Sequence, residues 1–322
     1  MTAADDREFH RYWQTLLEEL GALPPAAEES AIPLRSDEHC TCYGVRLTSW
    51  GPYRIFGYLC LPKRGDGPFP AYYYLPRYQS VVEIVPQGLS VDVRRDCVTF
   101  AIACRGQRMA DQPLIGEFPG LLTLGIDEAE TYPMRGWVAD CIRGLQYLRS
   151  RPEVDATRIA GAGFNDFALH TAALADGLCC VTATPGLFLP DGMPLLDARR
   201  RSDGKGDTSP RRATSSATRA YPLQEFHDYA RSFPDRVDAM HRTLSYFDPL
   251  RFADRISIPA LLWGGLPWGL HPVEDLQPLA ERIGPTAEIE ATVGSRSQDG
   301  ILQERWLAKQ LGLEPVLPEH WR

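Results

Sequence analysis

The sequence lacks the basic charge excess of a nucleic-acid-binding protein. Its 322 residues include 42 acidic and 34 basic side chains, for a formal net charge of −8. Proteins that bind the phosphate backbone usually present a basic surface, so this balance argues against nucleic acid as a partner. The Arg-rich stretch 199–219 is a local exception.

Long apolar runs and a targeting segment are missing as well. No window approaches the roughly 18 consecutive apolar residues that a membrane-spanning helix needs. The first twenty residues are acidic where a signal peptide is basic, and they contain no apolar stretch followed by small residues. We therefore expect a cytoplasmic protein without a membrane partner.

The eight cysteines do not follow the spacing of a zinc site or of a disulfide framework. The nearest approach to a metal motif is His-Cys-Thr-Cys at 39–42. A structural zinc needs four ligands, and no second Cys-x-x-Cys or His-x-x-x-His pair occurs. Alternate residues of a strand share one face, so Cys40 and Cys42 are expected to pack together. We predict buried, reduced thiols, with no metal and no cofactor.

The apolar pattern alternates short strands with helices. An amphipathic helix is predicted at 5–20. Strands are predicted at 43–47, 54–61, 70–75, 98–103, 158–162, 180–183, 259–264 and 287–292, and further helices at 136–150, 166–176, 223–245 and 300–311. This alternation predicts an α/β protein with a doubly wound, mostly parallel sheet and helices on both faces.

The whole chain, 1–322, is interpreted as one domain with two additions. Residues 1–35 are predicted to form an N-terminal helical extension, and about 186–245 a small helical cap insertion. Within the cap, 199–220 is rich in Arg, Ser, Thr, Gly and Asp without an apolar period, which is typical of a mobile loop. The helical stretch 223–245 is expected to close over the edge of the sheet.

Several motifs together resemble the acetyl xylan esterase and cephalosporin-C deacetylase family of α/β-hydrolases. They are Arg-Gly-Gln at 105–107, the helix YPMRGWVADCIRGL at 132–145, PEVDATRI at 152–159 and RTLSYFD at 242–248. The resemblance covers nearly the whole chain and implies an α/β-hydrolase fold. It also implies deacetylation as the family's activity and a homo-oligomer as the expected assembly.

The family's catalytic triad does not carry over to this sequence. Its members use a Ser nucleophile in a Gly-x-Ser-Gln-Gly elbow, followed later by an Asp and a His. By the resemblance, the elbow falls on 163–167 and Asn165 stands at the nucleophile position. Pro267 falls on the acid and Ser297 on the base, within a residue or two.

These replacements remove the chemistry of an acyl-enzyme. The amide of Asn165 cannot attack an ester, and the hydroxyl of Ser297 titrates too far above neutral pH to act as a general base. Pro267 has no polar side chain, and no histidine lies between His271 and His320. Loss of a whole triad costs on the order of 10⁶ in turnover, so ordinary deacetylation is not expected.

Three residues remain as candidates for catalysis. Asp166, beside the elbow, is a candidate acid or base because burial there would raise its pKa; alternatively it only caps the next helix. Asn165 is expected to hydrogen-bond a substrate carbonyl, or to be a tolerated turn residue. The resemblance implies an oxyanion hole formed by the backbone N–H groups of Asp166 and Tyr78.

Five further residues are candidates for substrate binding. Phe164 and Trp268 would supply the apolar walls that suit a small hydrophobic ligand. Gln107 belongs to the Arg-Gly-Gln motif, where a structural role is the alternative. His271 is expected either to reach the pocket or to be a solvated loop residue, and Ser297 marks the former histidine position.

Three functions remain open on this evidence. The first is a repurposed, non-hydrolytic enzyme of the cyclase or lyase type, which acts on a small metabolite through acid–base and oxyanion assistance. A role in bacterial natural-product biosynthesis would suit such an enzyme. The second is a binding or scaffold protein without catalysis. The third is an acyl-ester deacetylase that uses a rearranged set of residues.

Overall fold

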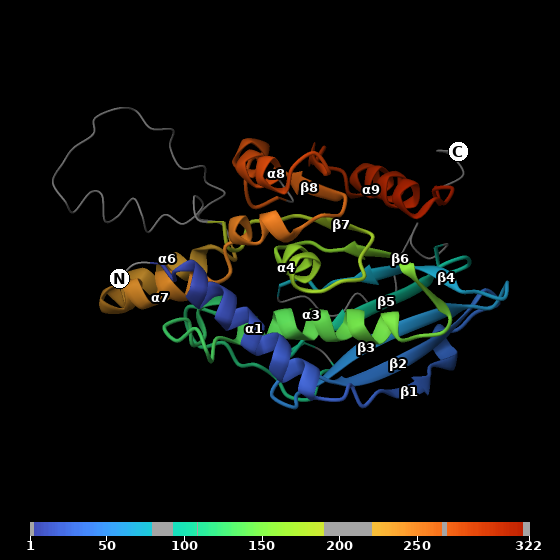
Figure 1. Cartoon of the computed structure of the whole chain (residues 1–322), viewed down its shortest axis with the longest axis horizontal. Helices are drawn as coiled ribbons and strands as arrows, with labels where there is room; N and C mark the ends of the chain where they lie inside the picture. The colour runs from blue at the N-terminus through green and yellow to red at the C-terminus, as the bar shows by residue number, and fades with distance from the viewer. Residues whose placement is uncertain (1–2, 79–92, 108, 190–220, 266–268, 318–322) are drawn as a thin grey trace.

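The computed structural model of the chain describes residues 3–78, 93–107, 109–189, 221–265 and 269–317. Within these residues, a nine-stranded sheet has the strand order β1-β2-β3-β5-β4-β6-β7-β8-β9 (Figure 1). The strands are β1 (Glu28–Ala31), β2 (Cys40–Thr48), β3 (Arg54–Pro62), β4 (Phe69–Tyr74), β5 (Val98–Ala103), β6 (Val154–Ala162), β7 (Cys180–Ala183), β8 (Ala260–Gly264) and β9 (Ala287–Ala291).

The sheet is antiparallel at one end and parallel through the rest. Strands β1, β2, β3 and β5 pair antiparallel in turn, and every pairing from β5 through β4 to β9 is parallel. The apolar runs of β4 and β5 are buried almost throughout, because helices cover both faces of the sheet there. The predicted α/β-hydrolase fold with a mostly parallel sheet is confirmed.

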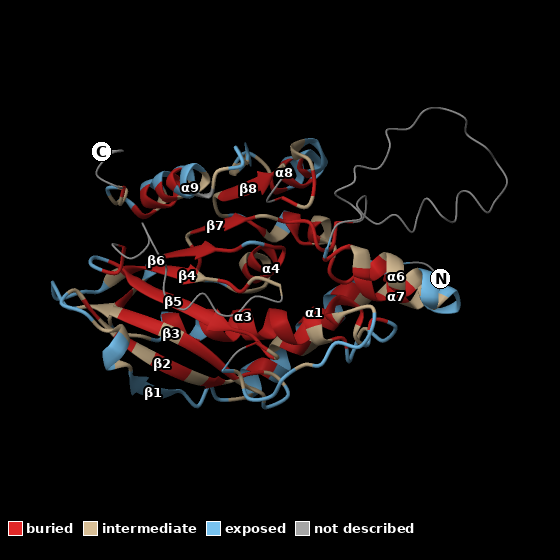
Figure 2. Cartoon of the chain, turned by 180° about the vertical axis from the view of Figure 1, so that it is seen from behind, coloured by how far each residue is buried: buried red, intermediate tan, exposed pale blue. Residues whose placement is uncertain are grey.

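Helices cover the two faces of the sheet unequally. The larger core joins one face to α1 (Asp6–Ala22), α3 (Pro133–Arg149), α4 (Phe167–Leu174) and α8 (Gln277–Ile283). On the opposite face, α9 (Arg296–Leu311) packs its Trp306, Leu307 and Leu311 against residues of the central strands. Figure 2 shows that α3 and the middle of the sheet are buried, whereas β1 lies exposed at the edge.

The predicted cap helix is two helices. α6 (Gln224–Ser232) and α7 (Val237–Leu244) are separated by a turn at Pro234–Arg236. The chain leaves the helical conformation at Phe233, the residue before Pro234, because proline disfavours helical geometry in its predecessor. The predicted mobile loop 199–220 lies outside the described residues, and the predicted boundaries of extension and cap stay predictions.

Two short elements were not predicted from the sequence. Strand β1 has the sequence EESA and is exposed along its length, so it carries no apolar alternation. Helix α8 is only seven residues long and has Pro278 in its first turn. None of the described helices is long and apolar enough to cross a membrane. The cytoplasmic location stays a prediction.

Candidate functional site

A sharp turn joins β6 to α4 at the position predicted for the elbow. β6 ends at Ala162, α4 begins at Phe167, and only four residues lie between them. A Cβ atom on Gly163 would lie 2.5 Å from the Cβ of Ala168, so only glycine permits this close approach of strand and helix. The turn is held to the next strand by the Gly163 N–H, which donates to Thr182 O at 2.9 Å.

Asn165 is fixed inside this turn. Its side-chain amide nitrogen donates to Pro76 O at 3.2 Å, and its Oδ1 accepts from the Phe167 N–H at 3.3 Å. Only 3% of the residue is exposed. The amide therefore ties the elbow to the loop after β4, and it also forms part of the cavity wall described below.

The Asp166 carboxylate points away from the cavity. It accepts from the Leu187 N–H at 2.7 Å and from the Gly186 N–H at 3.1 Å, in the loop that follows β7. Burial raises the pKa of Asp166 to about 6, although these hydrogen bonds oppose the shift. The side chain makes no capping hydrogen bond to α4, so the predicted capping role is wrong. The predicted acid–base role lacks access, because Asp166 is not among the described residues that line the cavity.

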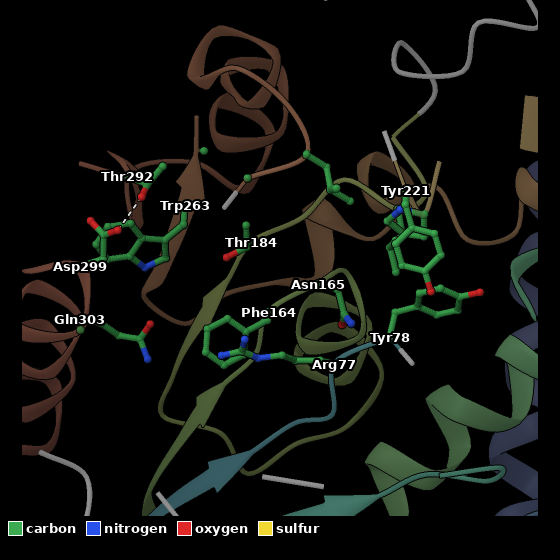
Figure 3. Close-up of a pocket in the computed structure, with 16 residues that line it drawn as sticks. Arg77, Tyr78, Phe164, Asn165, Thr184, Tyr221, Trp263, Thr292, Asp299 and Gln303 are labelled. Carbon is green, nitrogen blue, oxygen red and sulfur yellow. Dashed lines mark hydrogen bonds between the residues drawn. The ribbon is translucent and has the colours of Figure 1, made fainter. Parts of the chain in front are cut away.

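A cavity of about 370 Å³ opens at the carboxyl ends of the parallel strands (Figure 3). This edge of an open α/β sheet is where such folds usually bind ligands. Of the predicted site residues, Tyr78, Phe164 and Asn165 lie together on its wall. The other described lining residues are Arg77, Thr184, Leu187, Tyr221, Pro222, Trp263, Gly264, Gly269, Leu270, Thr292, Asp299, Gly300 and Gln303.

Arg77 and Phe164 form one wall of the cavity. The guanidinium carbon of Arg77 lies 3.4 Å from the centre of the Phe164 ring, in a cation–π contact. Figure 3 shows the arginine side chain extended along the ring.

The opposite wall carries a carboxylate that the sequence analysis missed. Asp299 lies in the first turn of α9, and its oxygens accept from the Thr292 hydroxyl at 2.5 Å and from the Val293 N–H at 2.9 Å. Asp299 follows Ser297 by two residues, and Ser297 itself is exposed. The resemblance places the family's catalytic histidine at Ser297 only within a residue or two. That margin includes Asp299, and it is the signal that could have identified this residue.

The indole nitrogen of Trp263 adds a donor to this wall. Trp263 is 94% buried on β8, and its Nε1 has no hydrogen-bond partner among the described residues. In Figure 3 the ring lies on the same side as Thr292 and Asp299, away from Asn165. The cavity thus has one apolar and cationic side near the elbow and one polar side near α9.

Gln107 lies outside the described cavity lining and joins two loops. Its Oε1 accepts from the Cys104 N–H at 2.8 Å, and its Nε2 donates to Arg77 O at 2.9 Å. The neighbouring Arg105 forms a buried ion pair with Asp140 at 2.8 Å. These contacts agree with the structural alternative for the Arg-Gly-Gln motif, and they act on the cavity only by holding the backbone of Arg77.

The two histidines near the elbow are buried instead of facing the cavity. His271 is 1% exposed, and its Nε2 lies 3.0 Å from Gly186 O, so the predicted solvated histidine is wrong. Nor is it among the described residues that line the cavity, so it does not reach the predicted pocket. His170 Nε2 lies 2.9 Å from Phe247 O, and burial lowers its pKa to about 4. Trp268 and Pro267 lie outside the described residues.

The cysteines at 40 and 42 pack as the strand pattern predicts. Cys40 and Cys42 are buried together with Cys60 of the neighbouring strand. Among the described residues, no group of three His, Cys, Asp or Glu side chains is arranged to hold a metal ion.

A parallel sheet with one strand-to-helix elbow and a cavity above it defines an α/β-hydrolase-fold protein. The chain belongs to the acetyl xylan esterase (AXE1) family, which matches residues 2–191. The family assignment and the esterase-like fold therefore agree with the resemblance seen in the sequence.

Individual relatives give the same picture. Acetyl esterase Axe7A of Xylanibacter ruminicola is 24% identical over 272 residues, which cover 80% of this chain and 56% of that protein. The chain thus spans about half the length of this curated relative.

Two solved structures show the likeness over the full fold. Acetyl xylan esterase 1 of a Thermoanaerobacterium species superposes with a TM-score of 0.78 at 20% identity, covering 96% of this chain and 95% of that one. The acetyl xylan esterase of a Paenibacillus species gives 0.75 at 22% identity, with 96% of each chain covered. At these identities the superpositions establish the fold.

Proposed function

We propose that this protein hydrolyses small acyl esters without forming an acyl-enzyme. The observation that carries the proposal is the pair of polar groups on the cavity wall, an amide at the elbow and the carboxylate of Asp299 in the loop and helix after β9. The family supports a hydrolase, and the names of the relatives make acetyl esters the first substrates to test.

The elbow residue cannot form a covalent intermediate. The nitrogen of the Asn165 amide is delocalised, so it does not attack an ester carbonyl. The same amide can donate a hydrogen bond to that carbonyl, since it lies on the cavity wall and carries two N–H groups. Asn165 would therefore orient the ester and polarise it.

Asp299 supplies the base that the proposal requires. Its carboxylate takes a proton from a water molecule, and the water oxygen attacks the ester carbonyl to give a tetrahedral oxyanion. That intermediate collapses with cleavage of the bond to the alcohol oxygen, which takes the proton from Asp299. The products are a carboxylic acid and an alcohol, so water is the only co-reactant.

The expected rate is modest. A positioned general base contributes roughly 10²- to 10⁴-fold, and the oxyanion hole and substrate binding that survive loss of a triad leave roughly 10³- to 10⁴-fold over water. Both oxygens of Asp299 already accept a hydrogen bond, which leaves fewer lone pairs free for a water molecule. Turnover should therefore lie well below that of a serine esterase.

The test measures how fast two variants hydrolyse p-nitrophenyl acetate and acetylated xylo-oligosaccharides. Asp299→Asn should lower kcat/KM about 100-fold, because an amide cannot accept the proton. The matched control is Asp254→Asn, the same change at an exposed aspartate that pairs with Arg282 and does not line the described part of the cavity. It should stay within about 3-fold of the wild type. Equal rates in wild type and Asp299→Asn would contradict the proposal.

A binding role without turnover is the second candidate. It is favoured by the lack of any histidine on the described part of the cavity wall. This role predicts that the wild type binds an acetyl ester, detected by ligand-observed NMR, and leaves it intact above the buffer background.

The cyclase or lyase reaction expected from the sequence has weaker support. It relied on Asp166 as the acid–base group, and that carboxylate is bonded to the Gly186 and Leu187 N–H groups. The comparisons favour a hydrolase over such a reaction.

A further inference from the structure

One buried carboxylate of the cap, that of Glu225, is hydrogen-bonded to a residue of the cavity wall. Glu225 lies in the first turn of α6 and is 5% exposed. The Tyr78 hydroxyl donates to its Oε2 at 2.9 Å, and the Leu122 N–H donates to the same oxygen at 2.8 Å. The Leu122 N–H also reaches the Tyr78 oxygen at 2.8 Å. One carboxylate oxygen therefore joins the cap, Tyr78 and the loop at 121–123.

The surrounding backbone is shaped to admit this carboxylate. A Cβ atom on Gly120 would lie 2.2 Å from the carboxyl carbon of Glu225. Gly120 has φ 163 and ψ −173, an extended conformation that any residue adopts. The missing side chain at 120 thus leaves room for the carboxylate, and the backbone conformation itself does not call for glycine. The next segment is fixed independently, because the Tyr132 hydroxyl donates to Leu122 O at 2.6 Å.

The same part of the cap also forms cavity wall. Tyr221 and Pro222 line the cavity, and they precede Glu225 by only a few residues. The ring centres of Tyr221 and Tyr78 are 6.3 Å apart. Figure 3 shows these two tyrosines side by side, next to Asn165. Glu225 therefore ties together two walls that come from distant parts of the chain.

We infer that Glu225 is a positioning residue, which holds Tyr78 in place beside Asn165 through the shared hydrogen bonds at its carboxylate. The inference rests on the proposed function, because Tyr78 is the residue whose backbone N–H the family resemblance assigns to the oxyanion hole. An oxyanion donor must lie at hydrogen-bond distance from the developing charge, so small displacements of Tyr78 lower the rate.

Substitutions at Glu225 separate geometry from charge. Glu225→Ala should lower kcat roughly 10-fold with little change in KM, because the donor is displaced in the transition state and substrate contacts remain. Glu225→Gln should restore most of the rate, since its amide oxygen can accept from both Tyr78 and Leu122. A loss of thermal stability in Glu225→Ala with an unchanged kcat would overturn the inference. So would a Glu225→Gln variant as slow as Glu225→Ala.

Gly120→Ala provides a second route to the same displacement. The added methyl group pushes the Glu225 carboxylate aside without removing it, so kcat should again fall roughly 10-fold. Tyr78→Phe should have a similar effect, and Tyr78→Phe combined with Glu225→Ala should be no slower than either single variant. The matched control is Tyr147→Phe, which removes a hydroxyl bonded to Glu29 at 2.7 Å. Tyr147 does not line the cavity among the described residues, so its variant should keep the wild-type kcat.

A spectroscopic measurement keeps this test independent of ester hydrolysis. In protein labelled with 3-fluorotyrosine, the ¹⁹F signal missing from Tyr78→Phe identifies Tyr78. That signal should shift in Glu225→Ala and in Gly120→Ala, and it should return towards the wild-type position in Glu225→Gln. If the wild type hydrolyses no ester and the signal shifts as described, the proposed function fails and the positioning stands. An unchanged signal in both Glu225→Ala and Gly120→Ala contradicts the positioning itself.

Discussion

The elbow after β6 and the turn into α9, which the sequence resemblance matches to two catalytic positions of the family, place their polar side chains differently. At the elbow, the side chains of Asn165 and Asp166 form hydrogen bonds to backbone groups of neighbouring loops. At α9, Ser297 stands where the resemblance predicts the family's histidine, and the carboxylate of Asp299, two residues further on, faces the cavity.

This difference shows that a fold preserves the place of a site more strongly than its chemistry. The polar side chains of the elbow satisfy backbone groups that would otherwise stay buried and unpaired, most of them in the loops after β4 and β7. Asp299, in the first turn of α9, also accepts from a backbone group, the Val293 N–H, but it lies on the cavity wall and can meet a ligand. Burial and a raised pKa alone do not identify a catalytic group, because Asp166 has both and lies outside the described lining.

The largest expected effect is a loss of folding stability at the elbow. Asp166→Ala leaves the Gly186 and Leu187 N–H groups buried and unpaired, which should lower the free energy of unfolding by about 3 kcal/mol. Asp166→Asn keeps one acceptor and should cost about half as much. Urea unfolding followed by tryptophan fluorescence measures both values.

The control for this prediction is an exposed aspartate. Asp254→Ala breaks a surface ion pair with Arg282 at 2.7 Å, which solvent screens, so it should change stability far less than Asp166→Ala. If Asp166→Ala lost its activity and kept its stability, Asp166 would be a catalytic group and the comparison would be reversed.

A second prediction concerns Glu304, a carboxylate on the same helix as Asp299. Glu304 faces the core, bonded to the Tyr72 hydroxyl at 3.3 Å, and burial raises its pKa from 4.5 to about 7. Folding therefore favours the protonated acid. Its contribution to stability is complete below about pH 4.5 and is lost as the pH rises to about 7.

Glu304→Gln should therefore flatten the decline of stability between these pH values, because an amide does not titrate. The measurement is the urea midpoint at half-unit pH intervals for wild type and variant. A variant whose pH dependence parallels that of the wild type would show that Glu304 is already ionised in the folded protein.

The smallest expected effect is at the elbow nucleophile position. Asn165→Ser introduces a hydroxyl, but His271 Nε2 lies beside Gly186 O and no histidine lines the described part of the cavity. Without a base the hydroxyl stays inert, so the variant gains no activity, and loss of the amide hydrogen bond to the ester should lower hydrolysis of p-nitrophenyl acetate by only about 3-fold. A fluorophosphonate probe checks the same point. Labelling of the new serine would show that a nearby base activates it, which would contradict this prediction.

The sequence predicted the parts of the fold whose burial pattern is simple. Strand β5 was predicted at its observed bounds, because a six-residue apolar run buried on both faces carries a strong signal. Strand β1 was missed because none of its side chains is buried. The elbow was located correctly because Gly163 and the strand-to-helix switch are local features.

The direction of the site side chains was not predictable in the same way. Asp166 turns away because N–H groups twenty residues later in the chain satisfy it, and only tertiary structure places them there. Asp299 was missed because its position depends on the register between β9 and α9. The link from Tyr78 to Glu225 joins residues 147 positions apart, and no local pattern indicates it.

The most direct test of the central claim is a rapid-quench experiment with p-nitrophenyl acetate at high protein concentration. Hydrolysis without an acyl-enzyme predicts p-nitrophenol release at a constant rate from the first turnover, and a protein whose intact mass does not change. A burst equal to the protein concentration, together with an acetyl group on a side chain at the cavity wall, would contradict the account.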